Sequence, residues 1–246
     1  MNSFISKSEQ TKNILQSALL AINLPVNILI LGEKGLGKKL LTKEITKDVQ
    51  SFDALLLEDL INNKKINLSH YKTLIIYDLQ NVLNKNEFLF NCKDIKIIAT
   101  TLTDSNEYTS SFAVKIQMPK LTSSSEDFKY ISKMYIKEAK ELSDNINVDS
   151  KKITYDLSQN GISLKKSIFK SIFNSSLNDN ELMKSFEEYL YEEIKKDKTY
   201  KDLLGLFEIP LLNASKKAFK SQLKISNQLG INRITLRKKL DYYFGA

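Results

Sequence analysis

Residues 32–39 carry glycines and lysines at a spacing suited to binding phosphate. Three glycines let the backbone turn its N–H groups toward an anion, and Lys38 supplies a positive charge for the outer phosphates. The candidate phosphate-binding residues are Gly32, Glu33, Lys34, Gly35, Leu36, Gly37, Lys38 and Lys39. We expect P-loop geometry here, and the sequence leaves open whether the loop still binds ATP with Mg²⁺.

The segments around this loop predict an α/β fold with a parallel sheet flanked by helices. The continuous apolar run Val26–Leu31 is typical of a buried parallel strand, and a helix should follow the loop to about Val49. A strand at Thr73–Tyr77 ends in Asp78, where an NTPase places its magnesium-binding carboxylate. Further strands are expected at Ala54–Leu57, Ile95–Ala99 and Phe112–Met118, and helices at Ser8–Leu24, Glu126–Leu142 and Asn178–Lys198.

A second group of candidate residues lies at the C-terminal end. Two short helices are predicted at Gln222–Leu229 and Arg233–Tyr243, separated by Gly230, so that Asn232 caps the second. This is a helix-turn-helix pattern. Leu236, Leu240 and Tyr243 would face a core, which leaves a polar set to meet solvent or a partner: Asn232, Arg233, Thr235, Arg237, Lys238 and Lys239. The alternative is a basic, solvated terminal helix.

The charge of the chain is concentrated in the same region. Of the formal net charge of +8, residues 214–246 carry +7, with eight lysines or arginines against Asp241. Arg233 and Arg237 are the only arginines of the whole chain. Because a guanidinium fork matches guanine edges and phosphates, this distribution favours a nucleic-acid-binding element over a generally basic surface.

The segment Gly230–Leu240 closely resembles the signature of the Fis-type DNA-binding domain. The resemblance implies that the polar set of the second helix contacts double-stranded DNA, with Ser221 and Gln222 touching phosphate from the preceding turn. Phe207–Leu212 resembles the start of the long helix through which Fis-type domains pair, which implies a homodimer. The chain departs from the family at Ile225 and Ser226, where small alanines are usual.

The preceding part resembles a reduced AAA+ domain of the NtrC-like enhancer-binding proteins. The resemblance implies a nucleotide site that includes Asp78, yet several of the family's catalytic groups are replaced. Leu79 stands in place of the activating glutamate, Leu102 in place of the sensor asparagine, and Ile162 in place of the second-sensor arginine. Residues 1–232 contain no arginine to act in trans, and the interval Val49–Thr73 has no room for the loop that engages sigma-54. We therefore expect no ATP hydrolysis and no sigma-54 activation.

These observations together predict four parts: a P-loop α/β subdomain at 1–120, a helical lid at 121–177, a helical linker at 178–200 and the Fis-type domain at 201–246. The predicted function is DNA-binding transcription regulation. The AAA+ remnant would serve as scaffold, as docking surface for RNA polymerase or a regulatory protein, or as nucleotide sensor. The alternatives are a slow P-loop ATPase anchored on DNA and a Fis-like nucleoid-organising protein.

The sequence excludes several other classes of protein. Single Cys92 and His70 residues leave no internal disulfide and no zinc cluster. We expect a cytoplasmic protein, because no membrane-spanning run and no signal-peptide pattern is visible.

Overall fold

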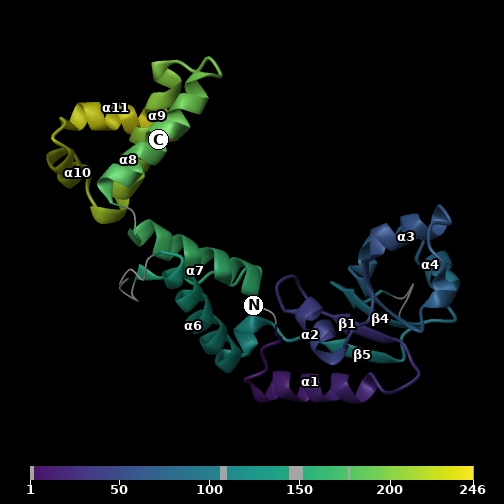
Figure 1. Cartoon of the computed structure of the whole chain (residues 1–246). Helices are drawn as coiled ribbons and strands as arrows, with labels where there is room; N and C mark the ends of the chain where they lie inside the picture. Colours follow the sequence, from purple (N-terminus) through teal and green to yellow (C-terminus); the bar gives the residue numbers. More distant parts are fainter. Residues whose placement is uncertain (1–2, 106–109, 144–151, 177, 246) are drawn as a thin grey trace. The chain divides into compact units, whose positions relative to one another are not determined.

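The computed structural model describes residues 3–105, 110–143, 152–176 and 178–245. It divides into two compact units, Met1–Ser176 and Leu177–Ala246 (Figure 1). The first unit holds a parallel β-sheet with its helices and a helical lid. In the described part of the second unit, all the regular elements are helices.

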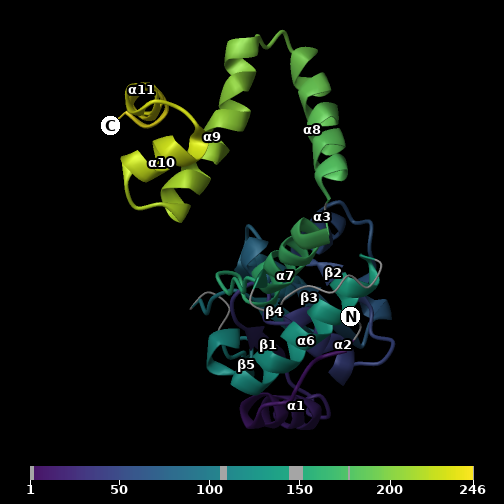
Figure 2. The same cartoon turned by 90° about the vertical axis from the view of Figure 1, so that its left-hand side faces the viewer.

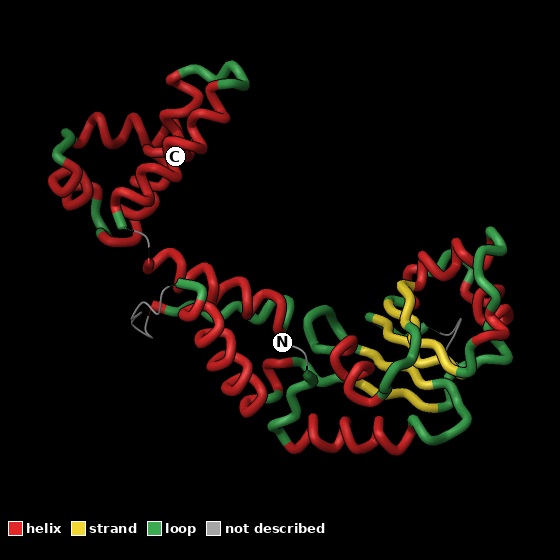
Figure 3. Tube along the Cα trace, viewed as in Figure 1, coloured by secondary structure: helices red, strands yellow, loops and turns green. Residues whose placement is uncertain are grey.

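A five-stranded parallel sheet forms the centre of the first unit (Figure 3, yellow). Its strands are β1 (Ile28–Leu31), β2 (Ser51–Asp53), β3 (Thr73–Tyr77), β4 (Lys96–Thr101) and β5 (Val114–Gln117), in the order β2-β3-β4-β1-β5. Strand β1 lies between β4 and β5, with Leu29 paired to Ala99 on one side and Lys115 on the other. All four residues of β1 are buried, as its uninterrupted apolar sequence requires.

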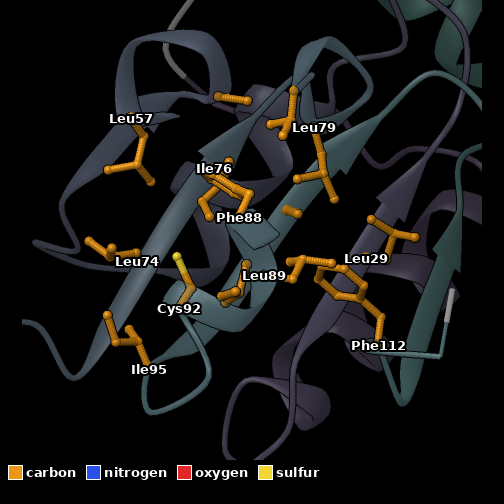
Figure 4. Close-up of a cluster of buried hydrophobic side chains, with 14 of the residues drawn as sticks. Leu29, Leu57, Leu74, Ile76, Leu79, Phe88, Leu89, Cys92, Ile95 and Phe112 are labelled. Atoms are coloured by element: carbon orange, nitrogen blue, oxygen red, sulfur yellow. The ribbon is translucent and has the colours of Figure 1, made fainter. Parts of the chain in front are cut away.

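Alternate residues of β1 face two separate hydrophobic cores. Ile28 and Ile30 pack in one core with α1 (Glu9–Ala21) and α2 (Lys38–Ile45), whereas Leu29 and Leu31 belong to the other. That second core contains Leu57 of α3 (Ala54–Asn62) and Phe88 of α4 (Lys85–Asn91) (Figure 4). Helices on both faces of a parallel sheet give the predicted α/β class.

The strand predicted at Ala54–Leu57 is wrong, because this segment opens helix α3. The strand β2 comes directly before it, and the Asp53 carboxylate caps α3 by accepting from the Leu55 N–H at 3.1 Å. Alanine and leucine favour helix once such a cap is present. Several other bounds also differ: β4 continues past Ala99 to Thr101, α2 ends at Ile45, before Val49, and the helix predicted at Asn178–Lys198 ends at Ile194.

A two-helix lid completes the first unit. Helices α6 (Ser125–Glu141) and α7 (Gly161–Ser176) pack through a small core that includes Tyr135, Ala139, Leu164 and Ile168. Part of the segment between them, residues 144–151, lies outside the described residues. The lid core is separate from the two cores of the sheet.

Helices α8 (Asp179–Ile194), α9 (Tyr200–Ala218), α10 (Gln222–Leu229) and α11 (Arg233–Phe244) make up the described part of the second unit (Figure 2). The bounds predicted for α10 are those observed, and α11 runs one residue beyond its predicted end. Leu212, Ile225, Leu236 and Leu240 form the buried core of this unit. Among the described residues, no helix of the chain combines the length and the apolar character that crossing a membrane requires.

Candidate phosphate-binding loop and cationic helix

The loop between β1 and α2 has backbone conformations that favour glycine. Gly35 and Gly37 have φ angles of 80° and 84°, in the left-handed region, and Gly37 caps the start of α2. Gly32 has no room for a side chain, because a Cβ atom there would lie 2.9 Å from the side chains of both Leu36 and Met118. The loop therefore joins a buried strand to a helix N-terminus, which is the arrangement of a P-loop.

Lys38 is buried at the start of α2 and faces the loop itself. Its ammonium group donates to the carbonyl oxygen of Glu33 at 2.9 Å and to that of Gly32. Burial lowers the pKa of this group, an effect that the nearby Asp78 carboxylate partly opposes. The ammonium is thus held inside the loop by two uncharged carbonyl oxygens, which the charged oxygens of a phosphate could replace.

Lys39 forms an ion pair with Asp78 at the end of β3. The Lys39 Nζ atom lies 3.0 Å from Asp78 Oδ2 and 4.7 Å from the centroid of the Tyr77 ring. The backbone N–H of Asp78 donates to Thr100 Oγ1 at 3.0 Å, which links the end of β3 to β4. The acid predicted at the nucleotide site is therefore beside the loop, but it is already paired with a lysine.

The lid contacts the loop through Asn160, which precedes α7. Asn160 is buried, and its side-chain amide donates to Lys34 O at 3.1 Å and to Glu33 Oε2 at 3.2 Å. Its Oδ1 atom accepts from the Leu121 N–H at 3.0 Å. Glu33 also pairs with Lys120 at 2.6 Å, and hydrogen bonding to Lys120 lowers the pKa of the Glu33 carboxyl. These bonds connect the phosphate loop with the lid and the segment leading to it.

A cavity of about 290 Å³ lies over the loop. This volume is close to the lower end of ligand pockets, roughly 300–1,000 Å³. It is lined by Lys34, Gly35, Leu36, Gly37, Lys38, Lys39, Leu40, Asp78, Thr100, Leu102 and Ile162. A neighbouring cleft of about 520 Å³ shares four lining residues with it, Gly35, Gly37, Leu40 and Ile162, and adds Tyr135, Lys165 and Phe169 from the lid. The cavity over the loop is lined by lysines, and the neighbouring cleft is lined in part by the aromatic rings of Tyr135 and Phe169.

Apolar residues stand at the three positions where the resemblance places catalytic groups. Leu79, in place of the activating glutamate, is fully buried in the core below β3 and β4. Leu102 and Ile162 line the cavity where the resemblance places an asparagine and an arginine. Asp78 is the one carboxylate among the described residues that line it.

The second group of predicted site residues is assembled on α10 and α11. Gly230 has a φ angle of 63°, and the helices on either side of it begin with capping side chains. Ser221 Oγ accepts from the Lys224 N–H at 3.3 Å, and Asn232 Oδ1 accepts from the Thr235 N–H at 2.8 Å. The predicted Asn232 cap is confirmed, and Ser221, predicted as a phosphate contact, also caps α10. The exposed Gln222 follows Ser221 at the start of α10.

Helix α11 has a buried apolar face and an exposed cationic face. Leu236 and Leu240 are buried, whereas Arg233, Arg237 and Lys238 are exposed and Thr235 is half-buried. Arg237 has only a distant partner, since its Nε atom lies 3.9 Å from Asp241 Oδ2. The exposed group contains one residue that the sequence analysis did not assign, Ile234, which is 69% exposed. The sequence does contain a sign of this exposure, because Ile234 follows Arg233 and lies outside the apolar stripe formed by Leu236 and Leu240.

Lys239 differs from Arg237 because its ion-pair partner belongs to another helix of the unit. It forms an ion pair with Glu208 of α9, and hydrogen bonding to Lys239 lowers the pKa of the Glu208 carboxyl. The Lys239 side chain is 33% exposed, less than half the exposed fraction of the Arg237 side chain at 77%. This contact joins α11 to α9.

No protein family model matches the chain, and no curated protein matches it in sequence. Solved structures do match it. The crystal structure of NtrX from Brucella abortus in complex with ATP is 13% identical, with a TM-score of 0.62, and the match covers 98% of this chain and 69% of that one. Its ADP complex gives the same values, and a third NtrX structure gives a TM-score of 0.57 at 12% identity over 97% and 68% of the two chains. At such identities the similarity shows the fold, which is an AAA+ P-loop fold.

Proposed function

We propose that this chain is a transcription regulator that binds double-stranded DNA through α11. Its P-loop unit would sense a nucleotide without hydrolysing it. The observation that carries the proposal is the exposed cationic surface of α11, which lies beside the stripe of the buried Leu236 and Leu240. Both arginines of the chain lie on this exposed face.

The chemistry of that face suits the major groove of DNA, which is about 12 Å wide and admits an α-helix. Arg233 and Arg237 are one helical turn apart, so their guanidinium groups can reach base edges or phosphates on the same side. The exposed Ile234 side chain offers an apolar contact for a thymine methyl group. Helix α10 would cross the DNA backbone as the first helix of a Fis-type helix-turn-helix.

The second unit also presents an apolar surface suited to a second copy of the chain. Helix α8 has one buried residue, Glu193, and most of its large apolar side chains are exposed. Exposed apolar side chains of α8 and α9 include Leu182, Met183, Tyr189, Tyr191, Ile194 and Phe207. Pairing through α8 and α9 would cover them. A homodimer would then present two α11 helices to successive major grooves, about 34 Å apart.

A binding role without hydrolysis is the best account of the P-loop unit. The cavity over the loop offers Lys38, Lys39 and glycine backbone to a phosphate chain. NtrX, which shares the fold, has been crystallised with ATP and with ADP. Leu79, Leu102 and Ile162 supply none of the groups that orient water or stabilise the transferring phosphoryl. Nucleotide occupancy would then regulate DNA binding or the docking of RNA polymerase or a regulatory protein.

The test is selection of DNA fragments by the intact protein. Sheared genomic DNA is incubated with the protein, and the bound fragments are sequenced for the wild type and for the double variant Arg233→Ala, Arg237→Ala. We expect the wild type to enrich a small set of fragments that share a roughly palindromic sequence, and the variant to enrich none. A matched control is Lys184→Ala, Lys195→Ala, which removes one charge from α8 and one from its C-cap residue and should leave the enriched set unchanged. Equal enrichment by the wild type and the arginine variant would refute the assignment of α11.

A further inference from the structure

The Lys39–Asp78 ion pair occupies the position where a P-loop protein holds its magnesium ion. In P-loop proteins the residue after the loop lysine gives a hydroxyl to Mg²⁺, and the acid at the end of a neighbouring strand holds the ion or its water. Here the first of these residues is Lys39, whose ammonium lies 3.0 Å from the acid, Asp78. The Lys39 ammonium is therefore a positive charge that already lies beside Asp78, where the magnesium ion would be.

The remaining groups do not complete a magnesium site. Mg²⁺ requires near-octahedral coordination by oxygen atoms, usually from one or two carboxylates with water and phosphate. Asp78 is the one carboxylate among the described residues that line the cavity, and its partner is a lysine. In the part of the chain that the structure describes, no group of three or more His, Cys, Asp or Glu side chains could hold a metal ion. The residues present thus do not fit Mg²⁺.

Two contacts besides the ion pair hold the Lys39 residue. Its ammonium lies 4.7 Å from the centroid of the Tyr77 ring, within the range of a cation–π interaction. The backbone carbonyl of Lys39 accepts from Thr42 Oγ1 at 2.9 Å, and Thr42 Oγ1 lies 3.4 Å from the Tyr77 hydroxyl. The lysine is therefore positioned over the end of β3 before any ligand binds.

The charges around the cavity match those that a metal would supply. Three lysines, Lys34, Lys38 and Lys39, line it against the single carboxylate of Asp78. The excess of two positive charges equals the charge of one divalent cation. A di- or triphosphate placed between Lys38 and Lys39 would therefore meet a net positive charge supplied by the protein alone.

We infer that Lys39 replaces Mg²⁺ in this site, so that the loop binds the phosphates of a nucleotide without a divalent cation. This inference rests on the proposed nucleotide-sensing function and specifies the ligand as the metal-free nucleotide. It is consistent with Leu79 and Leu102, because a site that holds its nucleotide without hydrolysis needs neither a glutamate to activate the attacking water nor a polar sensor side chain. The signal that this site reads would be nucleotide concentration independent of free magnesium.

The test is calorimetric titration of the full chain with ATP and with ADP, once in excess EDTA and once in excess MgCl₂. We expect dissociation constants that agree within about twofold between the two conditions. Lys39→Thr restores the hydroxyl and frees Asp78. For this variant we expect affinity in EDTA to fall by about tenfold or more, and Mg²⁺ to recover most of the loss.

A matched control is Lys43→Thr, which makes the same change one turn along α2 at an exposed position outside the cavity. Its affinities should equal those of the wild type in both conditions. Binding by the wild type in MgCl₂ alone would overturn the inference while leaving nucleotide sensing intact. Absence of binding in both conditions would overturn both. If Lys39→Thr behaves like the wild type in EDTA, Lys39 does not replace the metal.

Discussion

The backbone N–H of Gly161, the first residue of α7, donates a hydrogen bond to the carbonyl oxygen of Gly35 at 3.1 Å. The lid is therefore in direct contact with the phosphate loop. Neither residue has space for a Cβ atom, which would lie 2.2 Å from Gln159 O if placed on Gly35 and 2.9 Å from Gly35 O if placed on Gly161. Any ligand that shifts the loop must also act on the lid, which gives the unit a route for reporting occupancy.

Substitution of Gly35 by alanine should separate the lid from the loop. The φ angle of 80° at Gly35 is unfavourable for alanine, and the new methyl group would overlap the Gln159 carbonyl. We expect the first unit to lose about 1–3 kcal/mol of stability and the affinity for nucleotide to fall. Thermal unfolding and nucleotide titration of the variant measure the two effects.

Gly205→Ala is the matched control for that substitution. Gly205 lies inside α9, and a Cβ atom there would meet Ile209 Cδ1 and Tyr243 Cε1 at 3.5 Å, an ordinary contact distance. Alanine should therefore stabilise the second unit by about 0.5–1 kcal/mol. If the two alanine variants had equal effects, the close contact of lid and loop would be contradicted.

Removal of the Asp127 carboxylate should detach the N-terminal segment from α6. The two oxygens of Asp127 accept from the Lys7 N–H at 2.6 Å, the Ser8 N–H at 3.0 Å, the Ser8 hydroxyl at 2.6 Å and the Thr11 hydroxyl at 2.9 Å. Asp127 is 2% exposed, so alanine would leave buried donors without acceptors. We expect Asp127→Ala to cost about 3 kcal/mol in urea unfolding. The neighbouring exposed residue gives the control, and Glu126→Ala should change stability by less than about 0.5 kcal/mol.

Arg233 and Lys238 should contribute differently to DNA binding. Arg233→Ala should cost about 1–3 kcal/mol on a selected fragment and reduce the preference over random DNA, because a guanidinium can read a base edge. Lys238→Ala should weaken binding to both DNAs by a similar factor and reduce the salt dependence, as loss of a phosphate contact does. Fluorescence anisotropy on both DNAs across a salt series measures these effects. Equal losses on selected and random DNA for Arg233→Ala would contradict its role in base recognition.

The Glu208–Lys239 pair should make the second unit less stable in acid. Lys239 holds the pKa of Glu208 below its ordinary value of 4.5, so the folded state favours the ionised carboxyl. The resulting stabilisation is fully present above that ordinary pKa and is lost as the pH falls through the lowered value. Urea unfolding at a series of pH values should give a smaller acid-dependent loss for Glu208→Gln than for the wild type. Parallel pH curves for the two proteins would show that this pair does not stabilise the unit.

The sequence predicted best those elements whose signals are local. The apolar run Thr73–Tyr77 forms β3 with its predicted bounds, and Gly230 with the Asn232 cap determines where α10 ends and α11 begins. The segment Ala54–Leu57 was assigned wrongly, because a short apolar run fits a strand and a helix equally and the Asp53 cap was not recognised.

The candidate sites also contain contacts between residues that are far apart in the sequence. A local sequence pattern cannot predict such contacts. Asn160 reaches Glu33 and Lys34 across more than a hundred residues, and Asp127 reaches Ser8 across a similar interval. Lys239 was predicted as a phosphate contact from its place on α11, but the pairing with Glu208 depends on how α9 packs. Helix periodicity indicates which side of α11 is polar and says nothing about a partner from another helix.

The most direct test of the account is a single experiment in which the intact protein is mixed with a selected DNA fragment, ATP and MgCl₂. DNA binding and phosphate release are followed in the same samples. The account predicts selective binding to the fragment, no phosphate release above the protein-free rate, and the same rate for Lys38→Ala. Steady phosphate release that Lys38→Ala abolishes would show a working ATPase. That result would contradict the role assigned to Leu79, Leu102 and Ile162.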